Sequence, residues 1–298
     1  MRFRPMITCL TLAAVVAGCS HAAYSSAPIG AGTFSAQLSR TTVTDLARIQ
    51  PNRDPVQLPP LPAGDVVSVN LVFLDRTIEI APGVRYHAWT FNGVVPGPVI
   101  HARVGDTINV SLTNRASIGH SIDFHAALVP PDVAFQTVQP GRTLRFSWVA
   151  KYPGVFMYHC GTPPVLAHIS NGMYGAVVVD PPGGWLPAAR SYVLVQSEFY
   201  PSQVPGTADQ FVGDFTKMKS GMPDFVVFNG SAFRYQNRPL PVTVGERVRL
   251  FFVNAGPSHF PAFTSSGRSY AMCTWTAIQP TICAAFKRKT SRRAPARS

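Results

Sequence analysis

The chain has 298 residues, of which 46% are hydrophobic and 13% charged, so a sizeable core can form and wholesale disorder is excluded. Lys and Arg number 26 against 14 Asp and Glu, which gives a formal net charge of +12 at pH 7. Without Arg2, Arg4 and the seven basic residues after Phe263, 17 basic residues remain against 14 acidic ones. This near balance gives no case for nucleic-acid binding.

The N-terminus is typical of an export signal over residues 1–19. Arg2 and Arg4 precede an apolar run at 7–18, which is too short to span a bilayer as a mature helix. The segment Val16-Ala17-Gly18-Cys19 resembles a bacterial lipobox, in which a lipid on Cys19 would anchor the protein; the alternative is ordinary cleavage within 20–23. Both interpretations predict a mature protein that is periplasmic or anchored at the outer membrane.

Residues 20–65 are rich in Ser, Ala, Thr and Pro and end in Leu58-Pro59-Pro60-Leu61-Pro62, which indicates a tether. Strand-like runs begin at Val66 and predict a first domain over 66–182. Residues 67–73 alternate in hydrophobicity as a half-buried strand does. Further strands are predicted at 78–80, 85–91, 107–113, 143–149, 154–159 and 175–179. His87 and His101 fall in strand-like segments without evident partners.

Short strands separated by many turns, with 28 Pro and 23 Gly in the chain, favour an all-β Greek-key sandwich. A second strand series begins at 192–195 and predicts a partial second domain over 190–263. Phe91-Asn92-Gly93 ahead of Val104-Gly105 recurs as Phe228-Asn229-Gly230 ahead of Val244-Gly245. The similar offsets favour an internal duplication, with a boundary in Pro181-Pro182-Gly183-Gly184.

Residues 264–298 have no strand period, seven basic residues and no acidic one, and they contain Cys273 and Cys283. We interpret this aberrant basic tail as the product of a shifted reading frame that replaces the end of the second domain. The alternative is a genuine basic extension that binds a membrane or nucleic acid. Because the patterned part of the second domain has only about 75 residues, against the roughly 100 such a sandwich needs, we expect this domain to be incomplete.

The chemistry is carried by four motifs: His120-Ser121-Ile122-Asp123-Phe124-His125, His159-Cys160, His168 and Met173. A Cys thiolate and two imidazoles in a trigonal plane, with a distant Met thioether, are the ligands of a blue-copper centre. A lone thiol in an exported protein is more often a ligand or nucleophile than half of a disulfide. The alternative is an inert, buried small hydrophobe.

The alternation of side chains along a strand sorts these residues into two sites. If Cys160 faces a copper inside the sandwich, His159 faces outward. Asp123 and His125 are two positions apart and share a face, whereas His120 and His125 are five apart and do not. We therefore predict one metal on His120, Cys160, His168 and Met173, and a second site with His125 and His159 beside Asp123.

Residues 66–263 resemble the copper-containing nitrite reductase family. The segment Trp89-Thr90-Phe91-Asn92-Gly93-Val94-Val95-Pro96-Gly97-Pro98 is shared with multicopper oxidases generally. More specific are the His120–His125 motif, Tyr158-His159-Cys160 and His168-Ile169-Ser170-Asn171-Gly172-Met173. The segment Val195-Gln196-Ser197-Glu198-Phe199-Tyr200 resembles the family's second domain. The short loop from Cys160 to His168 is similar to the subgroup that includes outer-membrane-anchored enzymes.

The resemblance implies two cupredoxin domains per chain, a homotrimer, and an oxidoreductase that reduces nitrite to nitric oxide in denitrification or NO stress. His120, Cys160, His168 and Met173 would hold a type 1 copper, which receives electrons from a small donor protein, a cupredoxin or a cytochrome c. His125 and His159 would hold a type 2 copper between subunits, and Asp123 would deliver protons. Two further histidines of the family's second domain have no matching position here, so impaired activity is expected.

Three other functions compete with nitrite reduction. A laccase-like oxidase needs His-x-His pairs and a His-Cys-His run, whereas position 161 is Gly and no His-x-His occurs in the sequence, so that function is rejected. A blue-copper electron-transfer cupredoxin without catalysis stays open. So does a non-functional product of a damaged gene.

Overall fold

The computed structural model describes residues 56–127 and 136–260, together with the short strands β1 (Ser39–Arg40), β15 (Ser269–Tyr270) and β16 (Phe286–Lys287). The predicted signal with Cys19 lies outside the described residues, as do most of the predicted tether and basic tail. Within the tail, β15 and β16 pair with each other in antiparallel fashion. None of the helices in the described ranges is both long and apolar enough to cross a membrane.

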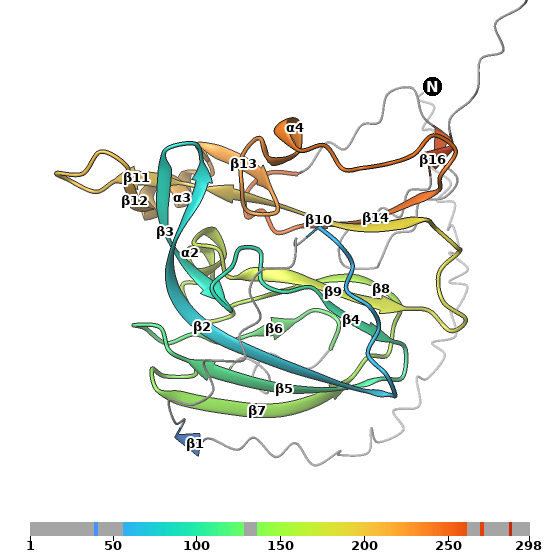
Figure 1. Ribbon diagram of the computed structural model, residues 1–298. Coiled ribbons are helices and arrows are strands. Elements are labelled where there is room, and N and C mark those ends of the chain that lie inside the picture. Colours follow the sequence, from blue (N-terminus) through green and yellow to red (C-terminus); the bar gives the residue numbers. More distant parts are fainter. Residues whose placement is uncertain (1–38, 41–55, 128–135, 261–268, 271–285, 288–298) are drawn as a thin grey trace, which may run out of the picture. The chain divides into compact units, whose positions relative to one another are not determined.

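The largest sheet has seven strands in the order β1-β7-β5-β2-β3-β12-β11 (Figure 1). Its strands besides β1 are β2 (Val66–Ala81), β3 (Val84–Phe91), β5 (Thr107–Asn114), β7 (Arg142–Val149), β11 (Pro201–Gln203) and β12 (Gln210–Gly213). The start of β2 alternates exposed and buried residues, which confirms the predicted half-buried strand. The short strand predicted at 78–80 is the far end of β2, because β2 continues through residue 81 as it pairs with β3.

A four-stranded sheet has the order β4-β9-β8-β6. Its strands are β4 (Ile100–Arg103), β9 (Tyr174–Asp180), β8 (Gly154–His159) and β6 (Asp123–Phe124). Residues of both sheets share one buried cluster, in which Leu71 and Leu112 of the large sheet lie with Tyr158 and Val177 of the smaller one. Two sheets with a common apolar interior form a β-sandwich, so the all-β prediction is confirmed.

The second half of the chain repeats the central pairing of the first. In the first half β2 pairs antiparallel with β3 and parallel with β5. In the second half β10 (Arg190–Phe199) pairs antiparallel with β13 (Phe225–Phe228) and parallel with β14 (Val248–Asn254). Within the ranges that the structure describes, the remaining elements are three short helices, α2 (Val165–Ser170), α3 (Phe215–Ser220) and α4 (Arg234–Asn237).

The repeated Phe-Asn-Gly motif makes the same contacts in both halves. Asn92 has a positive φ of 58°, its side-chain amide donates to the Asn70 carbonyl, and its Oδ1 accepts the Val72 N–H at 2.6 Å. Asn229 has a φ of 49° and binds β10 likewise, with Oδ1 accepting the Val195 N–H at 2.8 Å. In each half, an Asn side chain hydrogen-bonds its turn to the equivalent strand, β2 or β10, and we call this contact the Asn clamp. The shared contact supports the duplication.

The two halves also share a core. Val178 of β9 and Phe251 of β14 lie in one buried cluster with Tyr174 and Val193. Gly230 passes so close to the first half that a Cβ there would lie 2.0 Å from the Val95 carbonyl oxygen. The predicted boundary at 181–184 is a turn in which the Gly184 N–H donates to the Pro181 carbonyl at 2.9 Å, and the domain limits themselves stay predictions.

The prediction that His101 has no partner is wrong. His101 is buried on β4, where Nε2 lies 2.8 Å from Asp180 Oδ1 and Nδ1 lies 2.7 Å from the Pro59 carbonyl. Both partners are distant in sequence, so the strand pattern around His101 gave no sign of them. The contact between His101 and the Pro59 carbonyl joins the end of the predicted tether to β4. Nearby, the Leu58 N–H donates to the Ser191 carbonyl at 3.3 Å.

We predict that Asn229→Ala destabilises the protein by about 2 kcal/mol, because the buried Val195 N–H loses its acceptor. The measurement is the free energy of unfolding from urea denaturation of the full chain. Asn70→Ala is the matched control, since Asn70 is exposed on β2. Equal effects of the two changes would contradict the clamp.

Candidate metal centre

The β6–β8 pairing and the end of β8 place most of the predicted site residues. Asp123 on β6 is the Cα partner of His159, the last residue of β8. Cys160 follows directly, and its N–H donates to the Met173 carbonyl at 3.1 Å just before β9. His168 lies on α2, and His120 forms an isolated bridge with Val138 ahead of β6. Segments far apart in sequence thus converge at one end of the four-stranded sheet.

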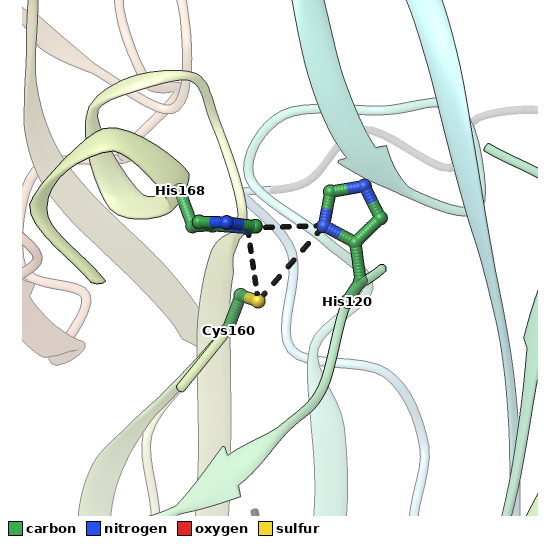
Figure 2. A group of neighbouring side chains, drawn as sticks. All are labelled: His120, Cys160 and His168. Carbon is green, nitrogen blue, oxygen red and sulfur yellow. Dashed lines mark hydrogen bonds between the residues drawn. The ribbon is translucent and has the colours of Figure 1, made fainter. Parts of the chain in front are cut away.

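His120, Cys160 and His168 form a buried group whose donor atoms face one another (Figure 2). The Nδ1 atoms of His120 and His168 lie 3.0 Å apart. Cys160 Sγ lies 3.2 Å from His168 Nδ1 and 4.0 Å from His120 Nδ1. Exposure is 0% for His120 and Cys160 and 2% for His168, so bulk water has no access to these donors.

Apolar residues surround this group. The Trp89 ring lies 4.8 Å from the His168 ring and 5.7 Å from the His120 ring, measured between centroids. Phe73 packs edge-on against His120 at 5.6 Å. Met173 is fully buried in the same core cluster as Cys160, and its N–H donates to the His168 carbonyl at 3.1 Å. Met173 therefore lies in the same backbone segment as Cys160 and His168.

Burial decides the protonation of these groups. Burial, assisted by the neighbouring His168, lowers the pKa of His120 to about 4. Burial also lowers the pKa of His168 to about 4, so both imidazoles are neutral near pH 7 and each carries a lone pair. The pKa of the Cys160 thiol is raised by burial, while the Ser121 N–H, which donates to Sγ at 3.3 Å, opposes that rise.

This donor set fits a metal ion. The Nδ1 atoms of His120 and His168 lie only 3.0 Å apart, a separation that is favourable when a proton or a cation lies between them. A cation would also deprotonate the Cys160 thiol, since the thiolate is the form that binds metals. A thiolate with two imidazoles suits a soft or borderline transition metal such as copper.

Asp123, His125 and His159 form a second group that is only partly buried. The Nε2 atoms of His125 and His159 lie 3.1 Å apart. Asp123 Oδ2 lies 3.6 Å from His125 Nε2 and 3.5 Å from His159 Nε2. These side chains keep between 12% and 19% of their surface exposed, so the group is open to a ligand that arrives from outside.

The hydrogen bonds of the second group define the His159 tautomer. His159 Nδ1 lies 2.9 Å from the Cys160 carbonyl oxygen, which can only accept, so Nδ1 carries the proton and Nε2 presents a lone pair to the group. Burial, assisted by His159, lowers the pKa of His125 to about 4. Burial raises the pKa of Asp123, while His159 acts in the opposite direction.

The structure therefore separates the two groups as strand alternation predicts. Cys160 is fully buried and its neighbour His159 is partly exposed. A single peptide bond joins the two groups, and the hydrogen bond from His159 Nδ1 ends on the Cys160 carbonyl.

The sequence patterns predict no role for Trp89 or Ser121. Trp89 lies in the segment shared with multicopper oxidases, and Ser121 lies inside the His120–His125 motif. Ser121 serves the buried group twice, because its N–H donates to Cys160 Sγ and its Oγ accepts the Gly161 N–H at 3.0 Å. The position of Ser121 next to a predicted ligand was a usable signal for this role.

Comparison with known proteins connects this geometry to copper. A profile of the multicopper oxidase family matches residues 74–184, which contain both groups. The chain is 36% identical to a copper-containing nitrite reductase of Neisseria gonorrhoeae over 208 residues, covering 68% of this chain and 53% of the relative. The chain thus spans about half the length of that curated relative.

The similar solved structures are also copper proteins. A copper nitrite reductase from Nitrosomonas europaea is 41% identical, with a TM-score of 0.58, and the match covers 64% of this chain and 68% of that one. A copper-containing nitrite reductase from Thermus scotoductus is 32% identical, with a TM-score of 0.56, over 64% of this chain and 44% of that one. A multicopper oxidase structure is 28% identical, with a TM-score of 0.55, over 68% of each chain.

We predict that the metal-free protein takes up copper in two steps of unequal strength. The buried group should bind tightly because its donors are preformed and include a thiol, and the open group should bind weakly because few donors are in place. Copper titration followed by metal analysis after gel filtration tests this. Cys160→Ala should remove the tight step and His125→Ala the weak one; loss of the tight step in His125→Ala would contradict the assignment.

Proposed function

Because the chain belongs to the copper-containing nitrite reductase family, we propose that it serves the one-electron reduction of nitrite, in which NO₂⁻, two protons and one electron give NO and water. The main support for this function is the arrangement of the two donor groups. A buried Cys-His-His group and a half-open His-His-Asp group lie on opposite faces of one strand end and are joined by the His159–Cys160 peptide.

We assign the buried group as the type 1 copper site, with His120, Cys160 and His168 as ligands and Met173 as the axial ligand. Its chemical support is the donor set and the exclusion of water. Rigid aromatic packing by Trp89 and Phe73 holds the imidazoles in place, as an electron-transfer site requires, because the ligands must not rearrange when the charge changes.

We assign the open group as the type 2 copper site, with His125 and His159 as ligands. Copper held at the two sites would supply one-electron transfer and Lewis-acid activation of nitrite. The protein's own residues orient the ligands and deliver the proton. The Cys160 carbonyl fixes the His159 ring, and Asp123 places a carboxyl oxygen within 3.6 Å of both imidazole Nε2 atoms. From there Asp123 can hold a proton at Oδ2 and pass it to an oxygen of nitrite.

The open group implies a further donor. Within residues 56–127 and 136–260 it consists of two imidazoles and one carboxylate, and a closed copper site needs more ligands than that. We propose that a histidine from a neighbouring copy completes it, in a homotrimer. The partial exposure of the three side chains leaves room for such an approach.

The proposal also includes a cellular location and an electron donor. The basic start and short apolar run at residues 1–19 support a periplasmic or outer-membrane-anchored location, with Cys19 as the candidate lipid site. A small donor protein, a cupredoxin or a cytochrome c, would deliver the electron to the buried group.

A blue-copper electron carrier without catalysis is the second candidate. The observation that favours it is the difference between the two groups: the described residues bring a thiol and two imidazoles together in the buried group but leave the open group with two imidazoles. Reversible copper reduction without nitric oxide formation would support this function instead.

We predict that the copper-loaded chain is intensely coloured, because a Cys thiolate bound to Cu(II) gives a strong visible charge-transfer band. Cys160→Ser should abolish the band, since a hydroxyl does not supply the sulfur orbital. Visible absorption after copper addition is the measurement, with His125→Ala as the control that should keep the colour. A Cys160→Ser protein that retains the band would refute the type 1 assignment.

We predict that any nitric oxide produced from nitrite depends on the open group. With a reduced artificial donor and no oxygen, His125→Ala should abolish turnover, and Asp123→Asn should lower it by about 100-fold as expected for the loss of a proton donor. An NO electrode gives the rate, and bleaching of the Cys160-dependent colour by the donor confirms that electrons enter the buried group. A coloured, reducible wild-type protein that forms no NO would favour the electron carrier.

A further inference from the structure

Four buried side-chain polar atoms lack hydrogen-bond partners among the residues that the structure describes, and two of them are His120 Nε2 and Asp75 Oδ1. Buried polar side-chain atoms nearly always have a partner, so each such atom calls for an explanation. The ring nitrogen and the carboxyl oxygen have complementary chemistry, since an imidazole N–H donates and a carboxylate oxygen accepts.

The strand register places Asp75 on the side of β2 that faces His120. Phe73 is two residues earlier on β2 and therefore shares this face, and its ring packs edge-on against His120 at 5.6 Å. Asp75 is also the cross-strand partner of Trp89, whose ring lies 5.7 Å from that of His120. Phe73, two residues before Asp75, and Trp89, opposite it, thus both pack against the same imidazole.

Asp75 also holds the segment that leads to His120. Its second oxygen, Oδ2, accepts the Ser117 N–H at 2.8 Å, three residues before His120. Burial dominates the pKa of His120 and lowers it, whereas the Asp75 charge acts on the same ring in the opposite direction. The carboxylate is therefore close enough to act electrostatically on the ring.

We propose that Asp75 is a positioning residue for His120, whose Nε2–H reaches Asp75 Oδ1 through one buried water. This contact would place the His120 proton on Nε2 and leave Nδ1 bare, and Nδ1 is the atom that faces Cys160 Sγ and His168 Nδ1. The role in copper binding rests on the type 1 assignment made above. The tautomer itself does not depend on that assignment.

A carboxylate behind a ligand imidazole has a defined effect on the metal. It fixes the ring orientation and raises the basicity of the bound nitrogen. A more basic ligand with a nearby negative charge stabilises Cu(II) relative to Cu(I). Asp75 would therefore strengthen Cu(II) binding and lower the reduction potential of the buried site, without touching the metal.

The first test uses the metal-free full chain and needs no copper. Two-dimensional NMR of ¹⁵N-labelled histidine rings near pH 7 reports which nitrogen carries the proton, with His120 identified by its absence in His120→Gln. We expect His120 to be protonated on Nε2 and bare at Nδ1. A proton on Nδ1 would overturn the proposal, whether or not the wild-type chain later proves to bind copper.

The second test compares two charge-removing substitutions on the same strand. Asp75→Asn keeps an oxygen acceptor but removes the charge, and Glu79→Gln removes the same charge from an exposed residue whose carboxylate accepts the Gly83 N–H. With the copper-loaded chain, Asp75→Asn should weaken Cu(II) affinity by about tenfold and raise the reduction potential while the visible band persists. Glu79→Gln should leave both quantities unchanged.

The outcomes separate the possible roles of Asp75. Equal shifts in the two variants would reduce its effect to general surface charge and would overturn the proposal. An unchanged potential and affinity in Asp75→Asn would leave it only its contact with Ser117, and would overturn the proposal as well. If Asp75→Asn does not fold, the wild-type NMR measurement still decides. A wild-type chain that binds no coloured copper would refute the type 1 assignment, whereas the NMR result would stand.

Discussion

Both candidate metal groups depend on the antiparallel pairing of β6 with β8. The pairing sets Asp123 opposite His159, and β8 ends at His159, so the next residue, Cys160, turns to the other face. Because neighbouring side chains on an extended chain point in opposite directions, one peptide bond supplies a ligand to each of two chemically different environments. No rearrangement of the fold is needed to connect them.

The difference between the two environments is a difference in desolvation. Inside the sandwich, burial makes the imidazoles of His120 and His168 neutral and keeps the Cys160 thiol protonated in the absence of metal. At the outer face the Asp123 group keeps contact with solvent. A buried, preformed donor set suits electron transfer, and an open set suits the entry of a substrate. The roles proposed for the two groups follow from this contrast.

The second half of the chain stabilises this arrangement although none of the described site residues belongs to it. Its sheet shares a core with β9 through Phe251 and Val178, and β12 extends the large sheet by pairing with β3. β3 in turn carries Trp89, which packs on both buried imidazoles. The clamp made by Asn229 therefore stabilises a sheet that supports the strands of the site from outside.

The sequence by itself determined the ligand types, their order and their division between two faces, because strand alternation and metal chemistry are local rules. It also predicted most strands of the first sandwich. Only the tertiary structure decided the contacts that these local rules miss: the partners of His101, the packing of Trp89 on the two buried imidazoles, and the pairing of Asp75 with Trp89. Each of these depends on which strands lie side by side. Strand pairing joins residues far apart in the chain, so a pattern read along the chain carries no record of it.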